Sequence, residues 1–130
     1  MGYSTRILGE LEITPPLTTE QVSRLNDFVQ ERHDEEGFPY YYCHWFPSDD
    51  GKTLSDESDC VSNYHYVDWL KYLIHHFFNP WGCKLNGTVH WEGEENSDMG
   101  KIEVHENSIT VFEAVIGYSR VNCWSPGEPL

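Results

Sequence analysis

The side chains of this chain that could do chemistry are its carboxylates, histidines and cysteines, and the carboxylates dominate. The chain carries 22 acidic and 8 basic residues, a formal net charge of −14. Three acidic clusters stand out: Glu31, Asp34, Glu35 and Glu36; then Asp49, Asp50, Asp56, Glu57 and Asp59; then Glu92, Glu94, Glu95 and Asp98. Each follows a predicted ordered element, so each can be held rigidly. Fixed carboxylates can imitate phosphates, which supply much of the affinity for nucleic-acid-binding proteins.

Two other interpretations of these clusters stay open. The run Asp49-Asp50-Gly51 resembles part of a calcium loop, but no Asp-x-Asp-x-Asp-Gly pattern with a terminal Glu is present. The clusters can also be a solvated acidic face that keeps a small protein soluble. A chain this acidic repels nucleic acid and anionic lipid and attracts basic protein surfaces. We therefore expect a basic protein as its partner, and no direct binding to nucleic acid or membranes.

A second group with chemical potential is His90 with Glu92 and Glu103 with His105. Residues of the same parity on neighbouring strands share a face, so we expect all four to project outward. Two imidazoles and two carboxylates can bind a divalent metal or move protons in catalysis. On a solvated sheet the same set forms cross-strand ion pairs instead. A metal-binding protein or small enzyme is therefore an alternative function.

The four cysteines are Cys43, Cys60, Cys83 and Cys123, and none forms a Cys-x-x-Cys pair. Cys43 and His44 meet Cys60 and His65 in a zinc site only if a hairpin joins them; otherwise these cysteines are small buried hydrophobic residues. Residues 1–6 lack a signal peptide's apolar run, and no stretch approaches the ~18 apolar residues of a membrane span. We expect a cytoplasmic protein with reduced thiols.

Local signatures of catalysis are missing from the sequence. It contains no Gly-rich phosphate loop, no Gly-x-Ser-x-Gly elbow and no His-Glu-x-x-His helix. We therefore predict a protein that is not an enzyme and uses no cofactor.

The first half of the chain predicts two strands, a helix and a further edge strand. Residues 3–13 alternate as a half-buried strand. Thr18 and Gln21 match a capping box, and apolar residues at helical spacing predict a helix over 19–32. The aromatic run 40–46 predicts a strand, and a further edge strand is expected around 53–54.

The second half predicts one more helix and a meander. Asn63 is a candidate cap for a helix over 64–78, whose wide apolar face makes it the spine of the core. Three antiparallel strands follow, the last two joined by a tight turn at Glu106-Asn107. We predict an α+β fold: a twisted antiparallel sheet of about four to six strands with two helices on one face. Residues 1–130 form a single domain, with residues 120–130 frayed.

Several segments resemble a group of small acidic proteins found in bacteriophages and bacterial genomes. They are Met-Gly-Tyr-Ser-Thr at 1–5, Gly-Glu at 9–10, Thr-Pro-Pro-Leu at 14–17, Trp-Leu-Lys-Tyr-Leu-Ile at 69–74, Pro-Trp-Gly at 80–82 and Leu-Asn-Gly-Thr-Val-His-Trp-Glu-Gly-Glu at 85–94. The group has no settled activity, so the resemblance transfers no catalytic residues. It implies a phage or mobile-element setting, in which small acidic proteins often inhibit host defence as anti-CRISPR proteins or DNA mimics.

The leading hypothesis is a non-catalytic, phage-type inhibitor, monomeric or dimeric, in the cytoplasm of a bacterial host. It would bind a basic nucleic-acid-binding protein or complex through its carboxylate clusters. Aromatic residues near the first cluster are candidate interface anchors, as Tyr and Trp are at hot spots; they are Tyr40, Tyr41, Tyr42 and Trp45. Their placement in the core is the competing interpretation. An accessory structural phage protein is a further alternative.

Overall fold

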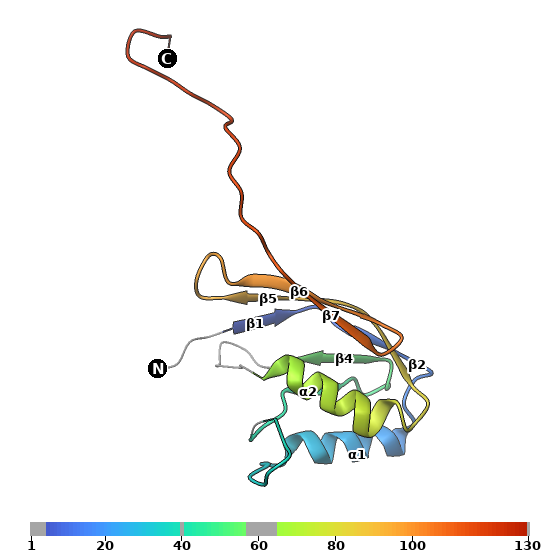
Figure 1. Ribbon diagram of the computed structural model, residues 1–130. Coiled ribbons are helices and arrows are strands. Elements are labelled where there is room, and N and C mark those ends of the chain that lie inside the picture. The colour runs from blue at the N-terminus through green and yellow to red at the C-terminus, as the bar shows by residue number, and fades with distance from the viewer. Residues whose placement is uncertain (1–4, 40, 57–64, 130) are drawn as a thin grey trace.

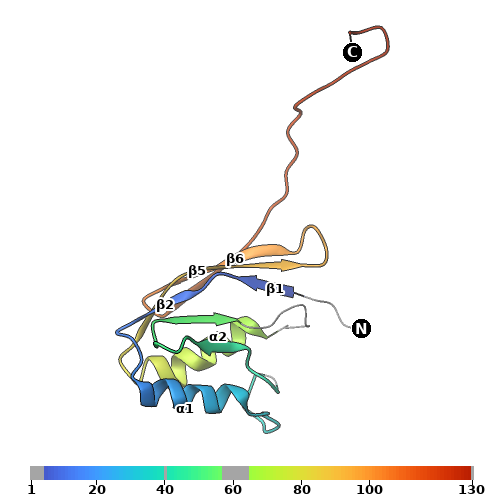
Figure 2. The same cartoon turned by 180° about the vertical axis from the view of Figure 1, so that it is seen from behind.

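The computed structural model describes residues 5–39, 41–56 and 65–129 and shows an α+β fold. A seven-stranded antiparallel sheet carries both helices on one face (Figures 1 and 2). The elements are β1 (Thr5–Leu8), β2 (Leu11–Thr14), α1 (Thr19–Gln30), β3 (Trp45–Pro47), β4 (Thr53–Asp56), α2 (Tyr66–Leu73), the π-helical turn η1 (Ile74–Phe78), β5 (Lys84–Gly93), β6 (Met99–His105) and β7 (Ser108–Glu113). The predicted fold class is confirmed.

The sheet is organised around β5, its longest strand. The order across the sheet is β3-β4-β2-β5-β6-β7, and β1 pairs with the far end of β5. β1 and β2 keep one register on β5, because Leu8 lies opposite His90 and Glu12 lies opposite Asn86. The single strand predicted over 3–13 is therefore two strands in register, which raises the strand count to seven.

Two glycines make the break between β1 and β2. Gly9 has φ 101°, and Gly87, across the ladder on β5, has φ 139°. A Cβ on Gly9 would lie 3.2 Å from the carbonyl oxygen of Thr88, and one on Gly87 would lie 3.2 Å from that of Glu10. Both positions need a positive φ beside a close backbone, which only glycine supplies without strain. The sheet bends here.

The first helix begins where the sequence predicts. Thr18 Oγ1 accepts a hydrogen bond from the backbone N–H of Gln21 at 3.1 Å, and Gln21 Oε1 accepts one from the N–H of Thr18 at 2.9 Å. This capping box pairs backbone donors that a helix start would otherwise leave free. Its buried stripe is Val22, Leu25 and Val29. The helix ends at Gln30, close to the predicted end.

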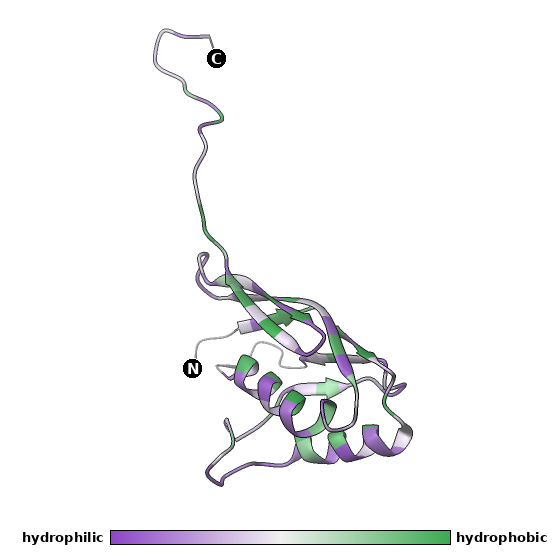
Figure 3. Ribbon diagram, turned by 45° about the vertical axis from the view of Figure 1, so that its right-hand side comes forward, coloured by the Kyte–Doolittle hydropathy of each residue, from purple (hydrophilic) through white to green (hydrophobic). Residues whose placement is uncertain are grey.

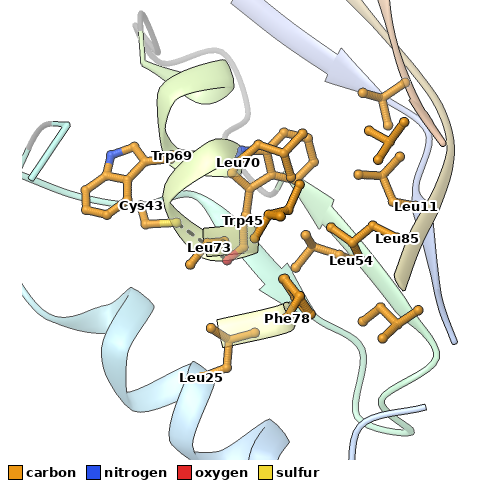
Figure 4. Close-up of a cluster of buried hydrophobic side chains, with 14 of the residues drawn as sticks. Leu11, Leu25, Cys43, Trp45, Leu54, Trp69, Leu70, Leu73, Phe78 and Leu85 are labelled. Carbon is orange, nitrogen blue, oxygen red and sulfur yellow. Dashed lines mark hydrogen bonds between the residues drawn. The ribbon is translucent and has the colours of Figure 1, made fainter. Parts of the chain in front are cut away.

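The second helix is observed as α2 continued by η1, in agreement with the prediction over 64–78; the proposed Asn63 cap lies outside the described residues. Figure 4 shows its apolar side chains against those of the sheet; the residues of this core include Leu11, Trp45, Leu54, Leu70, Leu73, Phe78 and Leu85. Trp45 Nε1 donates to the carbonyl oxygen of Tyr66 at 2.8 Å, which joins β3 to the start of α2. Burial of these large side chains is the main stabilising term of the fold.

Two predictions between the helices are wrong. The strand expected over 40–46 is reduced to β3, because residues 41–44 do not join the ladder: Tyr41 and Tyr42 are exposed, and Phe38, at the start of the aromatic run, packs on α2. The ring of Phe38 lies 6.3 Å from Trp69 and 5.5 Å from Tyr72. The strand expected at an edge around 53–54 is β4, which lies between β3 and β2, so β3 forms the edge.

The turn predicted at Glu106-Asn107 is confirmed, with φ values of 44° and 70°. Asn107 also anchors the start of β5, because its Oδ1 accepts from the N–H of Leu85 at 2.6 Å and its Nδ2 donates to the carbonyl oxygen of Cys83 at 2.9 Å. After Glu113 the chain leaves the sheet. Residues 114–129, the extended segment, contain no helix or strand and run away from the sheet (Figure 1).

Candidate functional site

The first acidic loop, residues 31–36, follows α1 and is anchored by a buried histidine. His33 is 7% exposed, and its ring centroid lies 4.4 Å from that of Phe28 and 4.5 Å from that of Phe38. Its Nε2 donates to the carbonyl oxygen of Phe28 at 2.9 Å, and its backbone N–H donates to that of Tyr41 at 2.6 Å. Its neighbouring carboxylates are exposed: Glu31, Asp34, Glu35 and Glu36.

The second acidic loop, residues 92–98, joins β5 to β6 and is closed by its own hydrogen bonds. The N–H of Gly93 donates to the carbonyl oxygen of Asp98 at 2.7 Å, and the N–H of Asp98 donates to that of Glu95 at 3.0 Å. Trp91 Nε1 donates to Asp98 Oδ1 at 3.1 Å. Asp98 is therefore half-buried and structural, while the other carboxylates of the loop, Glu92, Glu94 and Glu95, are exposed.

Both acidic loops lie toward the same side of the molecule, beyond the last residues of α1 and of β5, but at opposite edges of that side: the first at the helix layer and the second at the sheet (Figure 1). We call the two loops together the acidic end. Tyr66, at the start of α2, also lies at this end: burial raises its pKa to about 12, and the charges of Asp98 and Asp56 add to the shift.

The second predicted cluster does not form one surface. Asp49 and Asp50 occupy the turn between β3 and β4, at the opposite end of the molecule from the acidic end (Figure 2). Asp50 accepts hydrogen bonds from Ser48 Oγ at 2.6 Å and from the N–H of Lys52 at 3.0 Å, which hold its pKa below the usual value. Asp56 is only 9% exposed, so it cannot act as an accessible phosphate substitute. Glu57 and Asp59 lie outside the described residues.

The His/Glu set of the sheet shares the outward face, but its members are not brought together. His90 lies opposite Lys101, and Glu103 lies opposite Thr88. The Nζ of Lys101 approaches Oε1 of Glu103 to 2.9 Å, so a lysine occupies the centre of the supposed metal site. Among the described residues no three His, Cys, Asp or Glu side chains are arranged to hold a metal ion.

The aromatic and cysteine candidates divide between surface and core. Tyr41 and Tyr42 are 43% and 46% exposed beside the first acidic loop, whereas Trp45 is fully buried and cannot be an interface anchor. Tyr40 lies outside the described residues. Burial raises the pKa of the Cys43 thiol to about 12, which makes it a protonated core residue. Cys60 also lies outside the described residues, so the structure does not describe how the four candidate zinc ligands lie relative to one another.

An apolar groove that the sequence did not predict lies on the outer face of the sheet, on the side away from the helices. This outer-face groove has a volume of about 410 Å³ and is lined chiefly by Leu8, His90, Met99, Lys101, Phe112 and Ala114. Strand pairing brings these side chains together, since Leu8, His90, Lys101 and Phe112 form one cross-strand row. The sequence holds a hint of it: Leu8, Met99 and Phe112 are apolar at positions that point outward.

Comparison with known protein families, curated proteins and solved structures gives no match to this chain. None of the described helices is both long enough and apolar enough to cross a membrane.

Proposed function

We propose that this protein is a non-catalytic inhibitor of the phage anti-defence type, which binds a basic, nucleic-acid-binding protein or complex in the cytoplasm of a bacterial host. The observation that carries the proposal is the acidic end. Two loops from distant parts of the sequence present seven exposed carboxylates there: Glu31, Asp34, Glu35, Glu36, Glu92, Glu94 and Glu95. A basic groove that normally binds phosphates would meet them as substitutes.

The rigidity of both loops supports this role. His33 fixes the first loop from inside, and Asp98 fixes the second through Trp91, so little conformational freedom is lost when a partner binds. The exposed rings of Tyr41 and Tyr42 lie next to the first loop and can add apolar contact at the rim of the interface. Charge would then steer the encounter while the aromatic contacts add affinity.

The first test is to capture the partner from host lysate with the tagged protein, and then to measure binding of the purified partner with and without duplex DNA. We expect DNA to compete and salt to weaken binding. The variant Glu35→Gln/Glu94→Gln should weaken binding at low salt by about tenfold. The control variant Glu10→Gln/Asp49→Asn removes the same charge away from the acidic end and should bind normally.

Equal losses for both double variants would mean that net charge acts without a defined surface. Binding that survives both saturating duplex DNA and high salt would refute mimicry.

The accessory structural role is favoured by one observation, the exposed apolar residues of the extended segment. That role requires open assembly, because structural proteins of a particle repeat one contact without closing it. Growth of the purified protein beyond a dimer on sizing would support it.

A further inference from the structure

The extended segment has the wrong composition for a free tail. Three of its apolar side chains are almost completely exposed: Val115 at 94%, Tyr118 at 97% and Val121 at 96%. Segments that stay unfolded alone are poor in β-branched and aromatic residues, whereas this one is rich in them. Figure 3 shows hydrophobic colouring on the segment just beyond the sheet. Exposed apolar side chains gathered in one segment are typical of a binding element.

The outer-face groove is the matching apolar surface on the same chain. Leu8, Met99 and Phe112 are 37%, 38% and 42% exposed, which is high for large apolar side chains of a sheet. None of the described helices covers this face, because α1 and α2 pack on the other one (Figure 1). The groove and the extended segment meet at Ala114, which lines the groove and begins the segment.

Charge favours a second copy of this chain as the occupant of the groove. Arg120 and Glu128 are the only charged residues of the extended segment, so the net charge of −14 belongs entirely to residues 1–113. The segment itself therefore has no net charge, and the acidic body does not repel it. The groove rim carries Glu92 and Glu113, which suit Arg120.

The segment cannot enter its own groove in the conformation observed. Ala114 is part of the groove wall, and its N–H donates to the carbonyl oxygen of Met99 at 2.9 Å. To return, the chain would have to reverse directly after this residue, but residues 114–125 contain no turn or bend. A neighbouring copy's segment can cross the groove without any reversal.

We infer that residues 114–124 of one copy lie across the outer-face groove of a second copy, and that the exchange is reciprocal. The two copies form a closed, two-fold dimer in which each apolar segment is covered by the other chain. Of the seven exposed carboxylates of the acidic end only Glu92 lines the groove, so the other six stay exposed and the dimer can form with or without the proposed partner.

The test is the mass of the full-length protein by sedimentation equilibrium, over a range of concentrations and at two salt levels. We expect a monomer–dimer equilibrium that tightens between about 50 and about 500 mM sodium chloride, because salt screens the repulsion between the acidic bodies and leaves the apolar contact intact. Binding of a basic partner responds to salt with the opposite sign, so the two proposals can fail separately.

The variant Val115→Ser/Tyr118→Ser/Val121→Ser should weaken dimerisation by more than about tenfold. These side chains contact little in one copy, so the variant keeps its fold. The control Ser119→Ala/Asn122→Ala, in the same segment, should dimerise normally. Phe112→Ser, in the groove, should weaken dimerisation as much as the triple variant does. A one-to-one mixture of the segment and groove variants should partly recover dimer, because one of the two contacts is then intact.

A protein that stays monomeric at all concentrations and both salt levels would overturn the inference. So would a dimer insensitive to the triple variant, or assembly that continues beyond two copies.

Discussion

The first acidic loop and the extended segment both lack regular secondary structure, yet they place opposite kinds of side chain in water. In the loop, His33 and Phe38 are turned into the aromatic cluster and the carboxylates face solvent. In the extended segment, Val115 and Tyr118 face solvent. The comparison shows that irregular backbone is fixed when an apolar anchor finds a pocket within the chain. An apolar segment without such a pocket needs a surface from another molecule.

The largest expected contrast is in cysteine reactivity. Cys43 is buried and has its pKa raised from 9.0 to about 12, whereas Cys123 lies exposed in the extended segment. At about pH 8, in a solution dilute enough for the protein to be monomeric, alkylation followed by peptide mass mapping should modify Cys123 at least about a thousandfold faster, because the thiolate is the reacting form. Rapid labelling of Cys43 in the native protein would show that its core site opens readily.

The same shift predicts a loss of stability at alkaline pH. Above about pH 9 the unfolded chain releases the Cys43 proton, while the folded protein retains it until about pH 12. The urea midpoint should therefore fall as the pH rises above 9, and Cys43→Ala should make that fall shallower. If the urea midpoint of Cys43→Ala falls with pH as steeply as that of the wild type, groups other than Cys43 cause the fall.

The next effect concerns the anchor of the first acidic loop. His33→Ala removes the hydrogen bond to Phe28 and the ring contacts with Phe38, and should lower the free energy of unfolding by about 1–3 kcal/mol. Urea unfolding followed by tryptophan fluorescence measures it. Glu35→Ala, in the same loop but exposed, is the matched control and should change little. Equal stability of His33→Ala and wild type would mean that the loop is not pinned from inside.

The smallest effect is expected in the extended segment. For a dilute monomer, the triple serine variant of Val115, Tyr118 and Val121 should unfold within about 0.5 kcal/mol of wild type, because these side chains are already in water. At higher concentration the wild type should gain stability and the variant should not, since dimerisation stabilises only the folded form. A large loss of unfolding free energy in dilute solution would mean that the segment packs on the rest of its own chain.

The fold was predictable where one local pattern decides the structure. The capping box at Thr18 and Gln21 sets the start of α1, and the tolerance of Asn107 for positive φ sets the last turn. The aromatic run after Gly37 misled the analysis, because β propensity cannot tell an aromatic residue that pairs in a sheet from one, such as Phe38, that packs on a helix.

The candidate site was predictable only in part. Exposure of the carboxylates in the two acidic loops follows from composition. The burial of Asp56 and the distance of Asp49 from the acidic end depend on how the strands pair. The outer-face groove has the same origin, since the register of four strands creates it. The prediction of a frayed end over 120–130 says nothing of the exposed apolar residues just before it, such as Val115 and Tyr118, whose exposure depends on the path of the chain after β7.

The paired glycines at the sheet bend have a consequence for the ancestry of this chain. Gly9 and Gly87 are 78 positions apart, yet each sits against the backbone of the other's strand. A side chain at either one would push the strands apart and would be strained by the positive φ as well. In related sequences both positions should therefore remain glycine, and this pair would identify distant relatives whose other residues have diverged.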